Sequence, residues 1–269
     1  MKIFEAGWIM ALSSLLFGAQ GLAATFVYVS NNEEGTIGVY TLQADGSLQP
    51  GARVPTAGQM GVPLTVRPAK RFLIAGGRPQ PLAAQTYTIH RPPGALPAIR
   101  PGPPHDRTPS HPRDRTGRFL LGAPYGAHLV TVNPVGADGR VGETLQVIPT
   151  ALNAHAIITD NTNRYVFVPH LGTDQIFQFV FDEKTGRLAA NTPPIVQLKA
   201  GVGPRHLITS SDNRFVYLLN ELTATVTVFS LDQAKGLLTE IGSASALPAD
   251  SKLSPGAPRS GPARPWRAA

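Results

Sequence analysis

The chain has 269 residues, of which 42% are hydrophobic and 15% charged, so it is long and apolar enough to bury a sizeable core. It contains no cysteine, which excludes disulfides, cysteine ligands to zinc and thiol catalysis. The net charge of +7 comes mainly from two arginine-rich segments, 91–115 and 250–269. Because no stripe of aromatic and basic residues accompanies this charge, we expect no nucleic-acid partner.

Residues 1–24 have the pattern of an export signal. Lys2 supplies a positive start, an apolar run extends from Trp8 to Phe17, and small residues end at Ala24. The run is too short to cross a bilayer comfortably. We therefore expect cleavage of this segment, no membrane span in the mature chain, and a periplasmic or secreted protein. The alternative is a buried N-terminal helix in an uncleaved, cytoplasmic protein.

From Thr25 onward, one hydrophobic strand pattern recurs along the chain. The spacings between its aromatic residues are 46, 47, 46 and 50 residues. The five aromatic residues are Phe26, Phe72, Phe119, Tyr165 and Phe215. A period in the forties with β-rich content is the size of one four-stranded propeller blade.

Each unit carries further β signals after its first strand. Alternating apolar and polar residues at 36–40, 175–179 and 225–229 are typical of half-buried strands. Turns bearing Gly46 and Gly186 follow the first two of these runs, as tight hairpins require. The repeat predicts an all-β propeller with about five blades over 25–248. A β-helix has shorter rungs, and a sandwich does not repeat at a fixed period.

Two segments depart from the repeat. Residues 91–115 contain eight prolines, and no apolar strand precedes Asp114, where the later units have one. A proline-rich run cannot bond as a central strand, so we expect this segment to interrupt the repeat. Residues 249–269 have a similar composition. Both are either a disordered linker and tail or out-of-frame sequence, and the preserved spacing across 91–115 favours the second interpretation.

Candidate catalytic side chains stand at equivalent places in the fourth and fifth units. His155 precedes the first strand of one unit, Arg205 and His206 precede that of the next, and Glu221 follows a later strand. We expect them to meet at the mouth of the central channel. Arginine binds carboxylate or phosphate in a fork, and histidine or glutamate moves protons. Alternatively, Arg205 bridges blades, His155 and His206 are structural, and Glu221 caps a turn.

The sequence shows no sign of a cofactor. It has no metal-ligand cluster and no glycine-rich phosphate loop, so we expect neither a metal nor an organic cofactor. The Gly-X-Ser-X-Gly nucleophile elbow is also absent, which argues against a serine esterase.

Several segments resemble the lactonase propeller family, which includes bacterial 6-phosphogluconolactonases and fungal muconate-lactonizing enzymes. The resemblance covers about 25–90 and 115–248. The segments that carry it are Asn153-Ala154-His155, residues 165–174, Gly203-Pro204-Arg205-His206-Leu207, residues 214–222 and residues 225–229. It implies a seven-bladed propeller, incomplete in this chain, that holds no metal. It also implies that His155, Arg205 and Glu221 line the active site. The family usually has aspartate in place of His170, and its later arginine-bearing site segment is absent from this sequence.

We therefore expect a lactonase that hydrolyses a small-molecule sugar-acid lactone, formally 6-phosphogluconolactone to 6-phosphogluconate, and acts as a monomer. The predicted catalytic residues are His155, Arg205 and Glu221. The predicted substrate-binding residues are His206, Asn220 and His170. Because an export signal suits a phosphorylated cytosolic metabolite poorly, another lactone in the periplasm remains open. The alternative function is a non-catalytic exported propeller that binds a protein or glycan.

Overall fold

The computed structural model describes residues 25–31, 34–56, 64–67, 70–76, 83–90, 98–106 and 114–251. These residues form five antiparallel β-sheets. The predicted export signal and residues 91–97, 107–113 and 252–269 lie outside the described residues. Within the described ranges, no helix has the length and apolarity that a bilayer crossing needs.

Each sheet corresponds to one unit of the repeat. The first sheet contains β1 (Thr25–Asn31), β2 (Thr36–Leu42) and β3 (Leu48–Pro55). The second contains β4 (Leu64–Val66), β5 (Phe72–Gly76), β6 (Ala83–His90) and β7 (Ala98–Asp106). The third contains β8 (Phe119–Gly122), β9 (Leu129–Pro134) and β10 (Gln146–Pro149). The fourth contains β11 (Ile158–Thr159), β12 (Tyr165–His170), β13 (Gln175–Asp182) and β14 (Arg187–Gln197), and the fifth contains β15 (Pro204–Thr209), β16 (Phe215–Asn220), β17 (Thr225–Asp232) and β18 (Leu237–Ser245).

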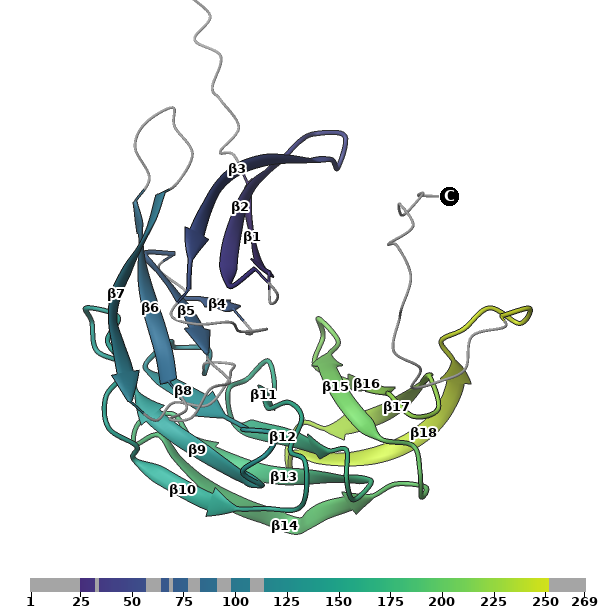
Figure 1. Ribbon diagram of the computed structural model, residues 1–269. Coiled ribbons are helices and arrows are strands. Elements are labelled where there is room, and N and C mark those ends of the chain that lie inside the picture. Colours follow the sequence, from purple (N-terminus) through teal and green to yellow (C-terminus); the bar gives the residue numbers. More distant parts are fainter. Residues whose placement is uncertain are drawn as a thin grey trace, which may run out of the picture.

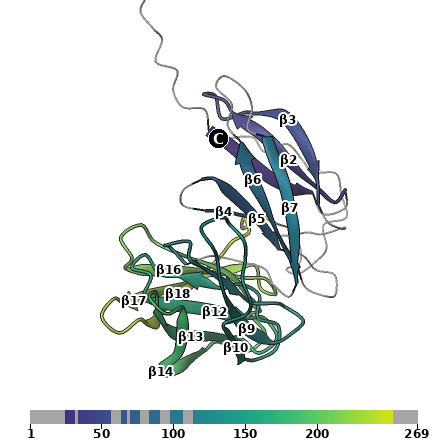
Figure 2. The same cartoon turned by 90° about the vertical axis from the view of Figure 1, so that its left-hand side faces the viewer.

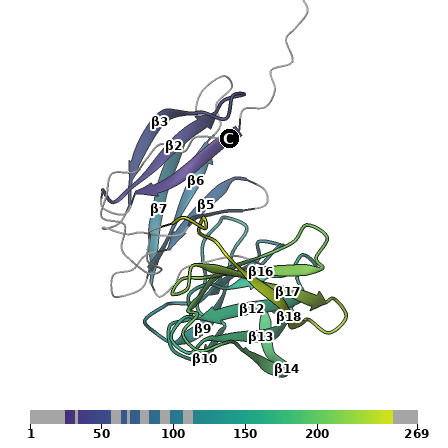
Figure 3. The ribbon, with the colours of Figure 1, turned by 90° about the vertical axis from the view of Figure 1, so that its right-hand side faces the viewer.

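The five sheets follow one another around an open arc, with the short strands β4, β11 and β15 on its inner side (Figure 1). In the two turned views, β1–β7 lie together in one group and the later sheets in another (Figures 2 and 3). Four of the five predicted aromatic positions begin strands β5, β8, β12 and β16, and Phe26 lies within β1. The predicted propeller-type fold with about five blades is confirmed.

Part of the proline-rich segment differs from expectation, because residues 98–106 form strand β7. This strand pairs with β6 over Ala83↔Asp106 to His90↔Ala98 and is the outermost strand of its sheet. An edge strand leaves one side of its backbone outside the ladder, so it tolerates proline where a central strand does not. The position just before Asp114, where the third unit lacks an apolar strand, lies outside the described residues.

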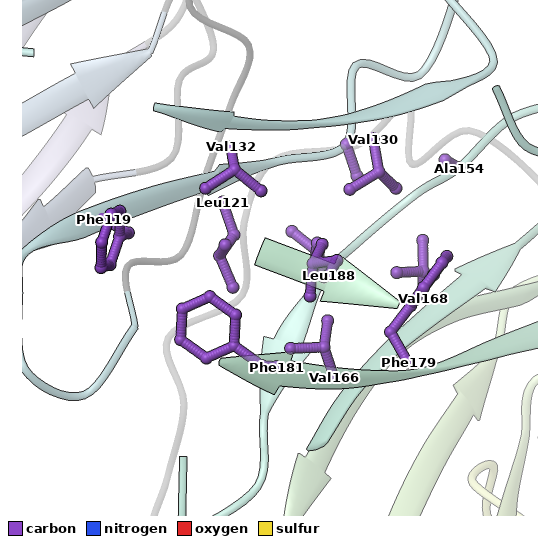
Figure 4. Packing of buried hydrophobic residues seen from close by; sticks show 12 residues of the cluster. Phe119, Leu121, Val130, Val132, Ala154, Val166, Val168, Phe179, Phe181 and Leu188 are labelled. Carbon is purple, nitrogen blue, oxygen red and sulfur yellow. The ribbon is translucent and has the colours of Figure 1, made fainter. Parts of the chain in front are cut away.

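Apolar side chains fill the space between neighbouring sheets (Figure 4). Strand β12 is buried on both faces, so its alternating side chains serve two interfaces. Val166 and Val168 pack toward the third sheet with Leu121, whereas Phe167 joins the cluster of the fifth sheet. Each such side chain contributes about 1.5–3 kcal/mol on burial. This packing holds the inner ends of consecutive sheets in fixed relative positions.

A ring-over-glycine contact also joins consecutive sheets. The Tyr165 ring lies where a side chain on Gly236 would start, because a Cβ there would be 2.0 Å from ring atom Cδ1. Gly236 has a φ of 68°, so glycine is required there for both backbone and space. The same contact recurs in two earlier pairs, Phe72 with Gly139 and Phe119 with Gly186.

A buried aspartate forms the polar part of this junction. Asp160 accepts hydrogen bonds from the Thr162 side chain and backbone and, at 2.9 Å, from Asn213 Nδ2 of the next sheet. One sheet earlier, Asn163 Nδ2 donates to Asp114 at 3.2 Å. Burial opposes ionisation of Asp160, but these hydrogen bonds hold its pKa below the usual value. The junction therefore combines apolar packing with buried carboxylates that have hydrogen-bond partners.

Candidate active site

Five polar or aromatic side chains from the third, fourth and fifth sheets gather at the inner ends of those sheets. His155 lies just before β11, and Arg205 and His206 lie at the start of β15. Glu221 follows the last residue of β16, and Tyr125 follows β8 by a short turn. Consecutive sheets thus each supply part of the cluster. This confirms the predicted proximity of His155, Arg205, His206 and Glu221.

A β-bulge sets the direction of Arg205. Pro204 pairs with Asn220 and His206 pairs with Leu219, so Arg205 is the extra, unpaired residue between them. In a regular strand, neighbouring side chains point to opposite faces, but a bulge breaks this alternation and re-aims a side chain. As a result, Arg205 Nη1 lies 3.3 Å from Nδ1 of the adjacent His206.

Glu221 is the centre of the charged contacts. Its Oε2 forms an ion pair with Arg205 Nε at 2.8 Å, and the same oxygen lies 3.8 Å from His155 Nε2. The Arg205 and Glu221 side chains are 40% and 39% exposed, whereas the His155 side chain is only 18% exposed. The carboxylate therefore orients the guanidinium and faces the imidazole from a partly open position.

Three rings form a row across the three sheets. The Tyr125 and His155 rings are 5.4 Å apart between centroids at 78°, and the His155 and His206 rings are 5.0 Å apart at 84°. Both contacts are edge-to-face, the geometry that aromatic pairs prefer. The three rings thus connect Tyr125 of the third sheet to His206 of the fifth sheet, which lies next to Arg205.

Backbone contacts hold each catalytic candidate in place. The His155 N–H donates to the carbonyl of Pro169 at 2.9 Å, and Ala154 bridges His170. The Glu221 N–H likewise donates to the carbonyl of Gly203 at 2.8 Å. His155 is thereby tied to β12, and Glu221 is tied to the residue just before β15.

Asp174, at the turn between β12 and β13, holds the loop that leads to Arg205. Its Oδ2 accepts from the Gly201 N–H at 2.7 Å, and its Oδ1 accepts from the Gly203 N–H at 2.8 Å. Gly203 has a φ of 64°, and a Cβ there would lie 2.5 Å from the Leu222 side chain. The fourth sheet thus fixes the entry to the first strand of the fifth.

Burial keeps the site imidazoles neutral at ordinary pH. Desolvation, reinforced by the positive charge of Arg205, lowers the pKa of His155 to about 4. Desolvation also lowers the pKa of His206, again with help from Arg205. A neutral imidazole has a free lone pair, so His155 can accept a proton.

Two of the predicted substrate-binding residues are placed away from this cluster. His170 has no exposed surface, and its Nδ1 lies 3.0 Å from the Val168 carbonyl. Asn220 is 1% exposed and donates from Nδ2 to Thr225 and Thr227 at 3.0 and 2.8 Å. In the described structure both residues support strand ends beneath the site, and neither has a surface for a substrate to touch.

Tyr125 and Asp174 are absent from the predicted site. Tyr125 was detectable, because it stands six residues after Phe119, just as Glu221 stands six residues after Phe215. Aligning the units on their aromatic residues therefore places Tyr125 at the Glu221 position. Asp174 gives no such signal, since its role depends on a loop of the following sheet.

The arrangement combines a guanidinium, a carboxylate and a neutral imidazole within hydrogen-bonding reach of one small region. Such a set can polarise a carbonyl, stabilise an oxyanion and transfer a proton to or from water. Among the described residues, no three His, Asp or Glu side chains gather as a metal-binding group would. Hydrolysis at a carbonyl carbon is one reaction that uses these three groups together.

Comparison with known proteins places this chain in a family. The model of the "Lactonase, 7-bladed beta-propeller" family matches residues 81–258, more than half of the chain. The chain belongs to this lactonase propeller family. The resemblance read from residues 203–222 is therefore confirmed, and the matched range contains the whole cluster around Glu221.

Relatives with curated names agree with this membership. The chain is 36% identical over 228 residues to a 6-phosphogluconolactonase of Pectobacterium carotovorum, covering 83% of this chain and 66% of that protein. It is 34% identical over 229 residues to a 6-phosphogluconolactonase of Klebsiella pneumoniae, with the same coverage. The chain thus spans about two thirds of the length of the curated relatives it matches.

A solved structure gives the same result for the fold. The periplasmic gluconolactonase of Pseudomonas aeruginosa superimposes with a TM-score of 0.71 at 28% identity. The match covers 85% of this chain and 69% of that one. The five described sheets therefore have the arrangement of a lactonase propeller over most of their length.

Proposed function

We propose that the protein is a lactone hydrolase acting on a small-molecule sugar-acid lactone, in the manner of the 6-phosphogluconolactonases. The observation that carries the proposal is the convergence of His155, Arg205 and Glu221 from two adjacent sheets around one carboxylate oxygen. The family membership and the names of the relatives support the same reaction class.

In the proposed mechanism, Arg205 binds the lactone carbonyl. Its Nε is engaged by Glu221, so the terminal guanidinium nitrogens donate to the oxyanion that forms as water attacks the carbonyl carbon. His155, neutral at ordinary pH, takes a proton from that water. When the ring C–O bond breaks, the imidazolium returns the proton to the departing ring oxygen. The product is the open-chain hydroxy acid, and the enzyme is unchanged.

Export is part of the proposal. Residues 1–24 carry a positive start, a short apolar run and small residues at Ala24, which is the pattern of a cleaved signal. A mature monomer in the periplasm or outside the cell would meet lactones of that compartment. N-terminal sequencing of the protein recovered from a periplasmic extract tests this, and an intact Met1 in a cytosolic fraction would contradict it.

Direct assay of the full chain tests the activity. Hydrolysis of D-glucono-1,5-lactone and of its 6-phosphate is followed by acid release above the spontaneous rate. Arg205→Ala should lower kcat/KM by about 100-fold or more, the scale of one lost oxyanion donor. Arg214→Ala is the matched control, because Arg214 stands just before β16 of the same sheet and its side chain pairs with nearby Asp212 and lies over the Phe215 ring. No rate above background on either substrate, or equal rates for both variants, would overturn the proposal.

A further inference from the structure

Tyr125 is a large aromatic side chain left open beside the catalytic candidates. It is 46% exposed and follows β8, on the third sheet. By contrast, Phe119 at the start of the same strand is 8% exposed and packs in the core between the sheets. Tyr125 belongs to none of the described hydrophobic clusters, so packing of the fold does not account for it.

The ring of Tyr125 is nevertheless held in a definite place. Its edge-to-face contact with His155 fixes the angle between the two rings at 78°. The turn that carries it closes through a 3.0 Å hydrogen bond from the Ala127 N–H to the Pro124 carbonyl. Asn153 Nδ2 donates to the Tyr125 carbonyl at 3.5 Å. A half-exposed aromatic ring that contacts a proton acceptor is suited to contact a ligand.

The position of the ring relative to the charges defines what it would contact. Tyr125 contacts His155 and His155 contacts His206, while Glu221 Oε2 lies 3.8 Å from His155 Nε2 and 2.8 Å from Arg205 Nε. In the proposed reaction the carbonyl faces Arg205 and the attacking water faces His155, so the substrate would lie beside the Tyr125 ring that contacts His155. The C–H bonds of a sugar ring form an apolar face, and its hydroxyls lie around the edge.

We propose that Tyr125 packs against the C–H face of the substrate's sugar ring and so selects cyclic polyhydroxylated lactones. This inference rests on the proposed lactone hydrolysis. Tyr125 contributes binding and orientation, and it takes no part in proton transfer. The phenol hydroxyl is not needed for this contact, whereas the ring is.

Kinetics of the full chain on D-glucono-1,5-lactone test the inference. Tyr125→Ala should raise KM by roughly tenfold or more, the effect of exposing one aromatic contact area, and should change kcat less. Tyr125→Phe should retain the wild-type KM. Tyr217→Ala is the matched control, because Tyr217 is 36% exposed and lies within β16 rather than in the ring row.

A binding measurement separates this inference from the proposed reaction. D-gluconolactam has a ring of the same size and hydroxylation, with N–H in place of the ring oxygen, and it resists hydrolysis, so calorimetric titration with it reports binding alone. Weaker lactam binding by Tyr125→Ala, rescued by Tyr125→Phe, supports the ring contact even if no hydrolysis is found. Unchanged KM and unchanged lactam affinity in Tyr125→Ala would overturn the inference and leave the lactonase proposal standing.

Discussion

Replacing Gly236 with alanine should destabilise the junction between the fourth and fifth sheets. A Cβ at Gly236 would lie 2.0 Å from Cδ1 and 2.2 Å from Cγ of Tyr165. Tyr165 is only 3% exposed and packed in the core of the junction, so its ring has little room to withdraw. The left-handed backbone of the new residue costs about 1–2 kcal/mol, and overpacking adds about 1–3 kcal/mol. The free energy of unfolding should therefore fall by about 2–5 kcal/mol.

Gly46 provides the control for the backbone part of this cost. It has a φ of 82°, and a Cβ there would meet nothing within 4 Å. Gly46→Ala should therefore cost only the conformational part, about 1–2 kcal/mol. Urea unfolding of both variants, followed by far-UV circular dichroism at one pH, measures the difference. Equal losses would refute the reasoning, because the contact with Tyr165 would then contribute nothing.

Three further predictions concern the site and its support. Asp174→Ala removes the acceptor of two hydrogen bonds from the loop before Arg205. Because Arg205 then loses its position, kcat/KM should fall by about tenfold or more. An unchanged kcat/KM would show that this loop keeps its conformation without Asp174. Arg205→Ala removes a positive charge beside His155, so the pKa of His155 measured by NMR titration should rise from about 4; a fall or no change would contradict this cause. Burial lowers the pKa of His170 to about 4, whereas in the unfolded chain it is about 6.5, so the unfolded chain binds the extra proton first. Stability should therefore be lost as pH falls from about 6.5 to about 4 and be level above that window, and His170→Gln should reduce the slope by about 1.4 kcal/mol per pH unit. Urea unfolding across that range measures it, and an identical slope in the variant would count against burial as the cause.

The repeat made the blades predictable from sequence. Phe72, Phe119, Tyr165 and Phe215 each begin a strand, and the first three of these rings lie over a glycine of the next sheet. The predicted alternating runs at 36–40, 175–179 and 225–229 became β2, β13 and β17. These are local patterns of period two, repeated at a fixed longer period, and such patterns depend little on distant contacts.

The direction in which individual side chains point could not be predicted from the repeat. Arg205 and His206 are neighbours in sequence, and regular strand geometry would have sent them to opposite faces. The bulge at Arg205 depends on register with Leu219 and Asn220, which only the folded sheet defines. The prediction for His170 was wrong. This polar residue at a strand end was predicted to face the substrate, but it is buried and its ring lies against Phe177.

The site itself follows from how a repeat protein acquires chemistry. His155 and Arg205 hold the same position in consecutive units, ten residues before Tyr165 and Phe215. The fold therefore brings equivalent positions of neighbouring sheets together at the inner end of the arc, whatever residues occupy them. His155, a proton acceptor in one unit, and Arg205, a guanidinium in the next, can therefore act together although the two units keep the same backbone fold. This argues that function in this chain depends on the differences between units, whereas stability depends on what the units share.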